Sequence, residues 1–315
     1  MKADFSPALA AAQSAAGAQL YPTGALYMLA TPIGNLADIS LRALHVLGLA
    51  DQIACEDTRH TQGMLGIYGI SKPLLAVHEH NEREAAQGII ARLAAGERIA
   101  YVSDAGTPAV SDPGARLAAA VSQAGFRVSP LPGASSITAL ISAAGLTGDS
   151  GSFVFEGFLS TKAKERDSQV MRLGSEPRAI ILLEAPHRIE ALAGALAALG
   201  ERSLTVGREL TKQFEQIATR PASEVSSWLA QDKHRCIGEF ALAIHPQTAT
   251  QTAAGEGERI LKLLLPELPT KTAVKLAADI SGEPRNALYD LALKLKKEDA
   301  QVDDAKLEDA KLKDA

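Results

Sequence analysis

The fold class is set by the stretch ALYMLATPIGNLADISLRALHVLGLADQIACE, residues 25–56. ALYMLA (25–30) and QIACE (52–56) are apolar runs of strand length, and ISLRALHVLGLA between them repeats apolar residues at helical spacing. The alternation continues through three further strand-length runs: LLAVH (74–78), IAYVS (99–103) and RVSPL (127–131). Strands that alternate with helices at this spacing predict an α/β domain on a mainly parallel sheet.

A second series of strand-length runs follows the first. Its members are SFVFEGFL, AIILLEAP, SLTVGREL, FEQIATR and IGEFALAI. The last three are separated by a single helix-length gap, 221–230, which predicts a mixed sheet with antiparallel neighbours. We therefore expect two α/β domains followed by a small helical unit. The expected boundaries are a flexible arm at 1–23, α/β domains at 24–145 and 146–246, a helix-turn-helix-like unit at 255–297 and a charged tail at 298–315.

The composition is that of a globular protein, with 46% hydrophobic and 22% charged residues. A net charge of -5 argues against a surface that coats DNA or RNA by charge alone, and residues 298–315 hold most of the acidic excess. The two cysteines, Cys55 and Cys236, lie too far apart in sequence for a CxxC zinc motif. With no signal peptide and no long apolar run, we expect a cytoplasmic protein without a membrane partner.

Three loops after expected strands have unusual compositions. They are ATPIGNLADIS (30–40), SDAGTPAVSDPG (103–114) and PLPGASSITAL (130–140). Ligands of open α/β sheets bind at such strand ends, where Asp104 and Asp112 could accept hydrogen bonds and Gly106 could approach a flat ligand. The structural alternative is that Asp38 and Asp112 cap the following helices. The first loop matches neither the G-x-G-x-x-G nor the Walker A pattern, which disfavours nucleotide sites of those two kinds.

Seven segments in order, ATPIGNLADIS, CEDTR, SDAGTPAVSDPG, PGASS, EGFL, LLEAPHR and GRELTKQFE, resemble the tetrapyrrole methylase-like (class III) methyltransferases. Within that class, residues 24–246 are most similar to the bacterial 16S ribosomal RNA (cytidine-2′-O)-methyltransferases, and the helical unit resembles their C-terminal appendage. The resemblance implies a homodimer that binds S-adenosyl-L-methionine as cofactor in a cleft between the two α/β domains. It also implies 2′-O-methylation of a cytidine ribose in the decoding region of small-subunit ribosomal RNA, in the assembled subunit, with no DNA partner.

Two other functions stay open at this point. Tetrapyrrole enzymes of the class carry a Gly-Pro-Gly-Asp type first loop, where this chain has Ile33, Gly34 and Asn35, so a precorrin or sirohaem-type substrate is disfavoured but remains an alternative. A non-catalytic ribosome assembly factor is the other.

The histidines show no zinc-enzyme pattern, and HEH at 78–80 lacks a third ligand nearby, so we expect no metal.

The resemblance also implies which residues contact the cofactor: Pro32, Gly34, Ser103, Asp104, Ala105, Gly106, Thr107, Pro108, Ser135, Ser136, Phe158, Leu183 and Ala241. The candidates for organising the reaction or serving the hydroxyl are Glu184, Glu209 and Lys212. The candidates for holding RNA phosphates are Lys162, Lys164, Arg166, Arg188 and Arg208. The alternative for these charged residues is a network of ion pairs that ties loops together, or a solvated helix face.

Overall fold

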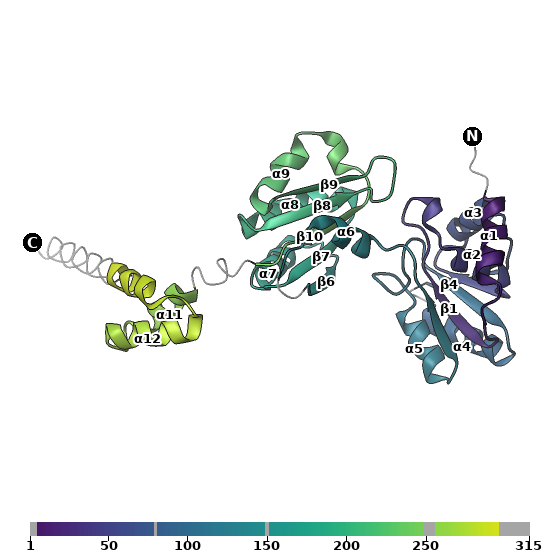
Figure 1. The fold of residues 1–315 in the computed structure, drawn as a ribbon, viewed down its shortest axis with the longest axis horizontal. Helices are drawn as coiled ribbons and strands as arrows, with labels where there is room; N and C mark the ends of the chain where they lie inside the picture. Colours follow the sequence, from purple (N-terminus) through teal and green to yellow (C-terminus); the bar gives the residue numbers. More distant parts are fainter. Residues whose placement is uncertain (1–4, 79–80, 149–150, 248–255, 296–315) are drawn as a thin grey trace, which may run out of the picture. The chain divides into compact units, whose positions relative to one another are not determined.

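The computed structural model describes residues 5–78, 81–148, 151–247 and 256–295 (Figure 1). Two compact units make up the chain, and the first of them contains both β-sheets. The second contains the C-terminal helices. The fold class expected from the sequence, two α/β halves followed by a helical unit, is therefore confirmed.

The first sheet has five strands in the order β3-β2-β4-β1-β5, and its strand pairs are parallel. The strands are β1 (Ala25–Leu29), β2 (Gln52–Cys55), β3 (Leu74–Ala76), β4 (Arg98–Val102) and β5 (Arg127–Leu131). Tyr27 and Leu29 pack with the apolar residues of α2 (Leu41–Leu49) and α3 (Thr58–Ile67), while Leu26 packs with those of α4 (Glu82–Ala94) and α5 (Ala115–Gln123). Helices therefore cover both faces (Figure 1), as the near-continuous apolar runs of the strands predict.

The N-terminal segment differs from the expected flexible arm. Residues Ser6–Ala16 form α1, which packs against α2 and buries Ala12 and Ala16. Phe5 adds an edge-to-face contact with Tyr68, with 4.9 Å between ring centroids. Alanine loses almost no side-chain entropy when it is buried, so an Ala-rich helix can be ordered by a close contact with a neighbouring helix. The sequence pattern alone did not reveal that neighbour.

The second sheet has the order β6-β7-β10-β8-β9. Its strands are β6 (Phe153–Gly157), β7 (Ala179–Glu184), β8 (Ser203–Arg208), β9 (Gln216–Pro221) and β10 (Phe240–Ile244). β10 is antiparallel to β7 and β8, and β9 is antiparallel to β8, so the antiparallel neighbours predicted from the sequence are present. One face of this sheet is covered by α7 (Ala163–Gly174), α8 (Ile189–Leu196) and α9 (Ala222–Ala230).

The opposite face of the second sheet is covered by α6 (Ser136–Ala144). Ile137, Leu140 and Ala144 form one apolar stripe of this helix and pack in one cluster with Ile181 and Ala241 of the second sheet. The sequence division assigned this helix to the end of the first domain. Its packing instead joins it to the second sheet, so the strand-end loop that leads into α6 connects the two halves.

The second unit contains α11 (Glu256–Leu264), α12 (Thr270–Ser281) and a further helix over 285–295. Its small core is built around Leu261, Ala273, Ala277 and Leu288. The expected tail at 298–315 and most of the linker before the unit lie outside the described residues. Among the described helices, none is long and apolar enough to cross a bilayer.

Glu82 provides a first testable prediction, because its buried carboxylate caps α5. Its Oε1 atom accepts hydrogen bonds from the backbone N–H groups of Gly114 (3.2 Å) and Leu117 (3.0 Å). Glu82→Ala leaves both buried donors without a partner, which is expected to lower the free energy of unfolding by about 2–4 kcal/mol. Glu82→Gln keeps an acceptor oxygen and is expected to cost less than half as much. Urea denaturation of both variants checks this, and equal losses would contradict the capping role.

Candidate active site

Hydrogen bonds tie the three unusual strand-end loops together. The backbone of Thr31 exchanges two hydrogen bonds with Gly106, of 2.9 and 3.0 Å, and its hydroxyl donates to the carbonyl of Ser103 at 3.2 Å. The hydroxyl of Thr107 donates to the carbonyl of Ala134 at 3.1 Å, which joins the second loop to the third. Gly106 has a φ of 80°, a conformation that side chains rarely adopt. The loops therefore form one fixed wall.

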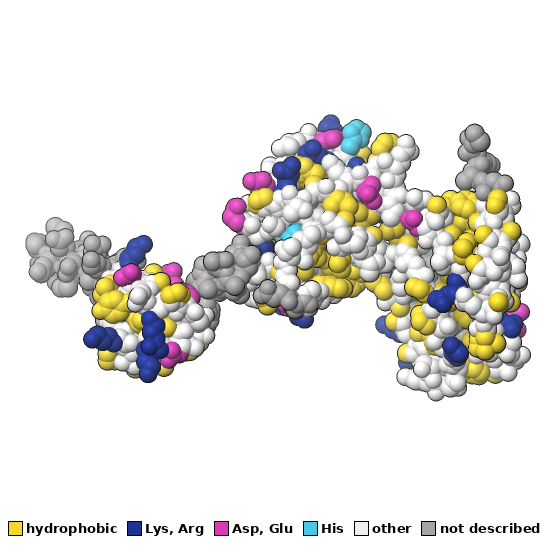
Figure 2. Space-filling model, in the orientation of Figure 1, with side chains coloured by type: hydrophobic (Ala, Val, Ile, Leu, Met, Phe, Trp, Pro, Cys, Tyr) yellow, Lys and Arg dark blue, Asp and Glu magenta, His cyan; other side chains and the backbone are white. Residues whose placement is uncertain are grey.

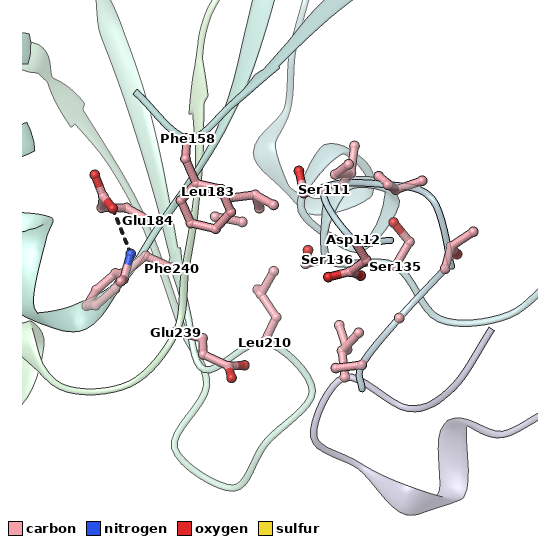
Figure 3. A pocket seen from close by; sticks show the side chains of 18 of the residues that line it. Ser111, Asp112, Ser135, Ser136, Phe158, Leu183, Glu184, Leu210, Glu239 and Phe240 are labelled. Carbon is pink, nitrogen blue, oxygen red and sulfur yellow. Dashed lines mark hydrogen bonds between the residues drawn. The ribbon is translucent and has the colours of Figure 1, made fainter. Parts of the chain in front are cut away.

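This wall borders a cavity of ≈ 390 Å³ whose opposite side is built by the second sheet (Figure 3). Nine of the residues implied by the sequence line it: Ala105, Gly106, Thr107, Ser135, Ser136, Phe158, Leu183, Glu184 and Ala241. Ser135 occupies the N-cap position of α6, but its side chain makes no capping hydrogen bond. The cavity has the mixed apolar and polar lining that is typical of small-molecule sites.

Five of the residues expected to touch a cofactor are not among those that line the cavity: Pro32, Gly34, Ser103, Asp104 and Pro108. Ser103 is buried at the end of β4, and Asp104 accepts a hydrogen bond from the backbone of Asp57 at 3.2 Å. A Cβ atom at Gly34 would overlap the aliphatic chain of Lys212. Ser103 and Asp104 therefore take part in the hydrogen bonds that join the strand-end loops.

Ten lining residues were not among the expected site residues: Ile33, Val110, Ser111, Asp112, Ile137, Ala185, Pro186, Leu210, Glu239 and Phe240. Asp112 was interpreted as a possible helix cap, but α5 begins at Ala115 and its N-cap is Gly114. Similarly, the cap of α2 is Ser40 and not Asp38. The acidic, proline-flanked loop around Asp112 was the signal available in the sequence. Leu210 and Glu239 carried no such signal.

Asp112 lies in a strongly acidic environment. Burial and, to a smaller extent, the nearby carboxylates of Glu56 and Asp104 raise the pKa of its carboxyl group to about 6, while a hydrogen bond from Ser103 acts in the opposite direction. Figure 3 shows the Asp112 carboxylate directed into the cavity beside Ser136. The cavity therefore contains an anionic group that protonates only slightly below neutral pH.

Lys212 lies between two carboxylates. Its Nζ atom is 2.7 Å from Glu209 Oε1 and 3.1 Å from Glu239 Oε2. Although burial opposes it, the hydrogen bonds with these carboxylates raise the pKa of Lys212. The pKa of Glu209 is lowered, because the contacts with Lys212 and with the backbone of Glu239 outweigh its burial. A lysine that stays protonated and a carboxylate that stays ionised are both poor proton acceptors at neutral pH.

Glu184 ends β7, but its carboxylate does not point into the cavity. Figure 3 shows the side chain turned away from the cavity centre, with one oxygen accepting from the N–H of Ala185 at 2.8 Å. The same oxygen is 3.0 Å from Nε of Arg188, whose guanidinium also donates to the carbonyl of Leu159. Burial raises the pKa of Glu184 despite these contacts. The pair therefore links the end of β7 to the loop that carries Phe158.

Two of the expected phosphate-binding cations have internal partners. Arg188 is paired with Glu184, and Arg208 donates to the carbonyls of Ile237 and Phe214 at 3.0 and 3.1 Å. These contacts are those of a network that ties loops together. Arg166 is half-buried near Glu184, whereas Lys162 and Lys164 are exposed at the start of α7. On the face drawn in Figure 2, Lys and Arg side chains lie in small separate groups.

No cluster of three or more metal-ligating side chains occurs among the described residues. His80, one of the two histidines of the HEH segment, lies outside them.

Comparison with known proteins identifies the family. The model of the Tetrapyrrole (Corrin/Porphyrin) Methylases matches residues 25–226. The chain belongs to the tetrapyrrole methylase family. As a member of this family, it is an S-adenosylmethionine-dependent methyltransferase. The model of the RsmI C-terminal HTH domain matches residues 251–296, which contain the C-terminal helices.

Relatives of this tetrapyrrole methylase cover nearly its whole length. A protein of Pseudomonas aeruginosa named ribosomal RNA small subunit methyltransferase I is 46% identical over 276 residues, 86% of this chain and 97% of the relative. The protein of the same name from Escherichia coli O157:H7 is 45% identical over 274 residues, 86% and 95% of the two chains. Among solved structures, a cobalt precorrin-4 methyltransferase has a TM-score of 0.54 at 16% identity, covering 71% of this chain and 98% of its own. At that identity, the likeness shows the fold alone.

The side chains that line the cavity of this tetrapyrrole methylase suit S-adenosylmethionine in their chemistry. Leu183, Leu210 and Phe240 offer apolar surface for an adenine ring, and the hydroxyls of Ser135 and Ser136 offer polar contacts. Glu239, which is paired with Lys212, adds a further polar side chain to the lining. At Gly106, a Cβ atom would lie 3.3 Å from Ile33 Cγ2, so the glycine allows the second loop to pack closely against the first at the cavity wall.

Proposed function

We propose that this chain transfers the methyl group of S-adenosylmethionine to the ribose 2′-hydroxyl of a cytidine in the decoding region of small-subunit ribosomal RNA. The observation that carries the proposal is the match to relatives named ribosomal RNA small subunit methyltransferase I along 86% of the chain. The helical unit that matches the C-terminal domain model supports the same branch of the family. The assembled subunit as substrate and a homodimer as the active form belong to this proposal.

The residues of the cavity would hold and orient the reactants. S-adenosylmethionine supplies a methyl group that is already activated by its positively charged sulfur. Ala105, Gly106 and Thr107 on one wall, Ser135 and Ser136 at the start of α6, and Phe158, Leu183 and Ala241 on the other wall would hold it. Fixing two reactants in line can contribute up to ~7–11 kcal/mol to the reduction of the barrier. The apolar side chains also exclude water, which strengthens the effect of the cavity's charges.

The experiment that tests the proposal is methyl transfer to ribosomal particles. Small subunits are isolated from cells with and without this protein, and mass spectrometry maps ribose methylation in their RNA. We expect one 2′-O-methylcytidine in the decoding region to be absent without the protein. Purified protein and S-adenosylmethionine should restore it on isolated subunits, and naked RNA serves as the comparison substrate. An unchanged methylation map would exclude the proposal.

The exposed cations at the start of α7 provide a further prediction. Lys162 and Lys164 are exposed, and Lys162 pairs with Glu165 at 2.9 Å, a weak surface contact that RNA phosphate can replace. If both contact phosphates, Lys162→Ala/Lys164→Ala lowers the slope of log K against log salt by about two. Lys72→Ala/Lys233→Ala removes the same charge elsewhere and is expected to leave the slope unchanged. Equal slopes for both double variants in filter binding would rule out this contact.

A further inference from the structure

Three carboxylates belong to residues that line the cavity, and their surroundings differ. Glu184 is turned away from the cavity and paired with Arg188, and Glu239 is paired with Lys212. Asp112 has no ion pair with any described residue, and its neighbours Glu56 and Asp104 are anions. An anion that is paired with a cation is a weak proton acceptor, because the cation stabilises its charged form. Asp112 alone of the three faces the cavity without such a partner in the described part of the chain.

The backbone places this carboxylate in the cavity. Ala109 and Ser111, on either side of Val110, have φ values of 67° and 64°. Such conformations cost about 1–3 kcal/mol each for residues other than glycine and are retained where the surrounding structure requires them. Figure 3 shows Asp112 and Ser136 side by side at the cavity wall, with Leu210 on the opposite side. The strained loop therefore aims Asp112 at the space where the reactants would meet.

We propose that Asp112 is the catalytic residue that accepts the proton of the ribose 2′-hydroxyl during methyl transfer, which rests on the proposed function. The ribose oxygen forms a bond to the methyl carbon as the carbon–sulfur bond breaks, and that bond's electron pair stays on sulfur to give S-adenosylhomocysteine. The hydroxyl proton passes to a carboxylate oxygen of Asp112 and then to solvent. The step needs no further reactant.

The charges around Asp112 suit this task. Glu56 follows β2, Asp104 lies in the same loop as Asp112, and Glu82 and Tyr101 lie on α4 and β4. Arg116 of α5 borders a neighbouring hollow together with Asp112, and its guanidinium is paired with Glu82 at 3.9 Å. Burial and the two anions Glu56 and Asp104 raise the pKa of Asp112 to about 6. A carboxylate of this pKa is still ionised at pH 7.5, and it binds a proton more strongly than an ordinary aspartate does. General bases of this kind contribute typically ~10²–10⁴-fold to the rate.

The first test compares Asp112→Asn with wild type on small subunits that lack the methyl group. We expect kcat to fall by about 10²–10⁴-fold, with the dissociation constant for S-adenosylmethionine changed by less than about threefold in calorimetric titration. Asp167→Asn, on the exposed surface of α7, is the matched control and should keep the wild-type kcat. Thermal unfolding of Asp112→Asn establishes that the variant folds.

The second test uses the pH dependence of the wild-type enzyme and does not need a variant of Asp112. We expect kcat to rise with pH and to level off above an apparent pKa of about 6. Glu56→Gln removes a nearby negative charge, so the pKa of Asp112 falls and this acid limb moves to lower pH. A purely structural role of Glu56 or Asp112 would not move it.

The outcomes separate the two proposals. If the wild-type protein methylates none of the RNA substrates, the proposed function is overturned and this inference with it. An active wild type with Asp112→Asn within about threefold of its kcat overturns this inference alone. So does a variant that loses affinity for S-adenosylmethionine and keeps kcat, because Asp112 would then bind the cofactor. The inference is also overturned if the acid limb of the pH profile of kcat lies at the same pH in Glu56→Gln as in wild type.

Discussion

Replacing Gly106 by valine is expected to weaken S-adenosylmethionine binding by at least ~100-fold, an effect of about 3 kcal/mol. Gly106 lines the cavity with a φ of 80° and forms the two backbone hydrogen bonds with Thr31. A Cβ atom there would lie 3.3 Å from Ile33 Cγ2, and the valine methyl groups add bulk at the cavity wall. The variant therefore has to move the wall or fill part of the cavity.

The matched control is Gly125→Val, in the turn between α5 and β5. Gly125 has a φ of 83°, and a Cβ atom there would have no neighbour within 4 Å. Both variants incur backbone strain of about 1–3 kcal/mol, and only Gly106→Val adds the close contact with Ile33, so Gly125→Val measures the effect of strain alone. Calorimetric titration should show the loss of affinity in Gly106→Val only. Equal affinities in the two variants would contradict the placement of the cofactor at this wall.

The strands could be predicted from the sequence because a short run of apolar residues is enough to indicate a buried strand. Runs such as IAC (53–55) and AIILL (179–183) are apolar without interruption, and their strands are buried on both faces of a sheet. The position of α6 was not predictable in this way. Its apolar stripe fits either sheet, and only the packed structure shows that Leu140 meets Ile181 and Ala241. Likewise, the Ala-rich α1 has no periodic signal that would distinguish a docked helix from an unfolded arm.

The part of the site that lies in the three unusual strand-end loops could be predicted from the sequence. Gly106 and Ser135 lie in loops whose composition marks them, and both line the cavity. The roles of charged residues were harder to predict, because the role of a charge depends on burial and on partners distant in sequence. Arg208 was expected at phosphates, and it holds the carbonyls of Ile237 and Phe214. Glu239 enters the site through the register of β10 and its contact with Lys212, which no local pattern encodes.

The Glu184–Arg188 pair leads to the prediction with the largest effect on stability. The side chain of Glu184 is 1% exposed and that of Arg188 is 19% exposed. The second oxygen of Glu184, Oε2, is buried without a hydrogen-bond partner among the described residues. Arg188 is the only ion-pair partner of Glu184 in the described part of the chain. Removing the partner of so buried a carboxylate is costly, because the remaining charge is poorly solvated and loses its nearest cation. Arg188→Ala is expected to lower the free energy of unfolding by about 3–5 kcal/mol at pH 7.5.

The pH dependence of this loss identifies its cause. Burial already raises the native-state pKa of Glu184 above its ordinary value, and loss of the Arg188 charge raises it further. The stability linked to a raised pKa is present below the ordinary value and is lost as the pH rises through the raised one. As the pH falls, Glu184 in the variant takes up a proton more readily than in the wild type and then needs no cation, so the difference between Arg188→Ala and wild type should be smaller at pH 5 than at pH 7.5. Urea denaturation at both pH values measures this difference.

A control variant and a double variant test whether the unpaired charge of Glu184 causes the loss of stability. Arg92→Ala removes the arginine of an exposed pair with Glu97, whose atoms are 3.2 Å apart, and is expected to cost less than about 1 kcal/mol at either pH. Adding Glu184→Gln to Arg188→Ala removes the unpaired charge and should recover part of the lost stability at pH 7.5. Phe158, next to the Leu159 carbonyl that Arg188 holds, lines the cavity, so Arg188→Ala should also weaken S-adenosylmethionine binding. A loss no larger than that of Arg92→Ala, or the same loss at both pH values, would mean that the pair does not neutralise a buried charge.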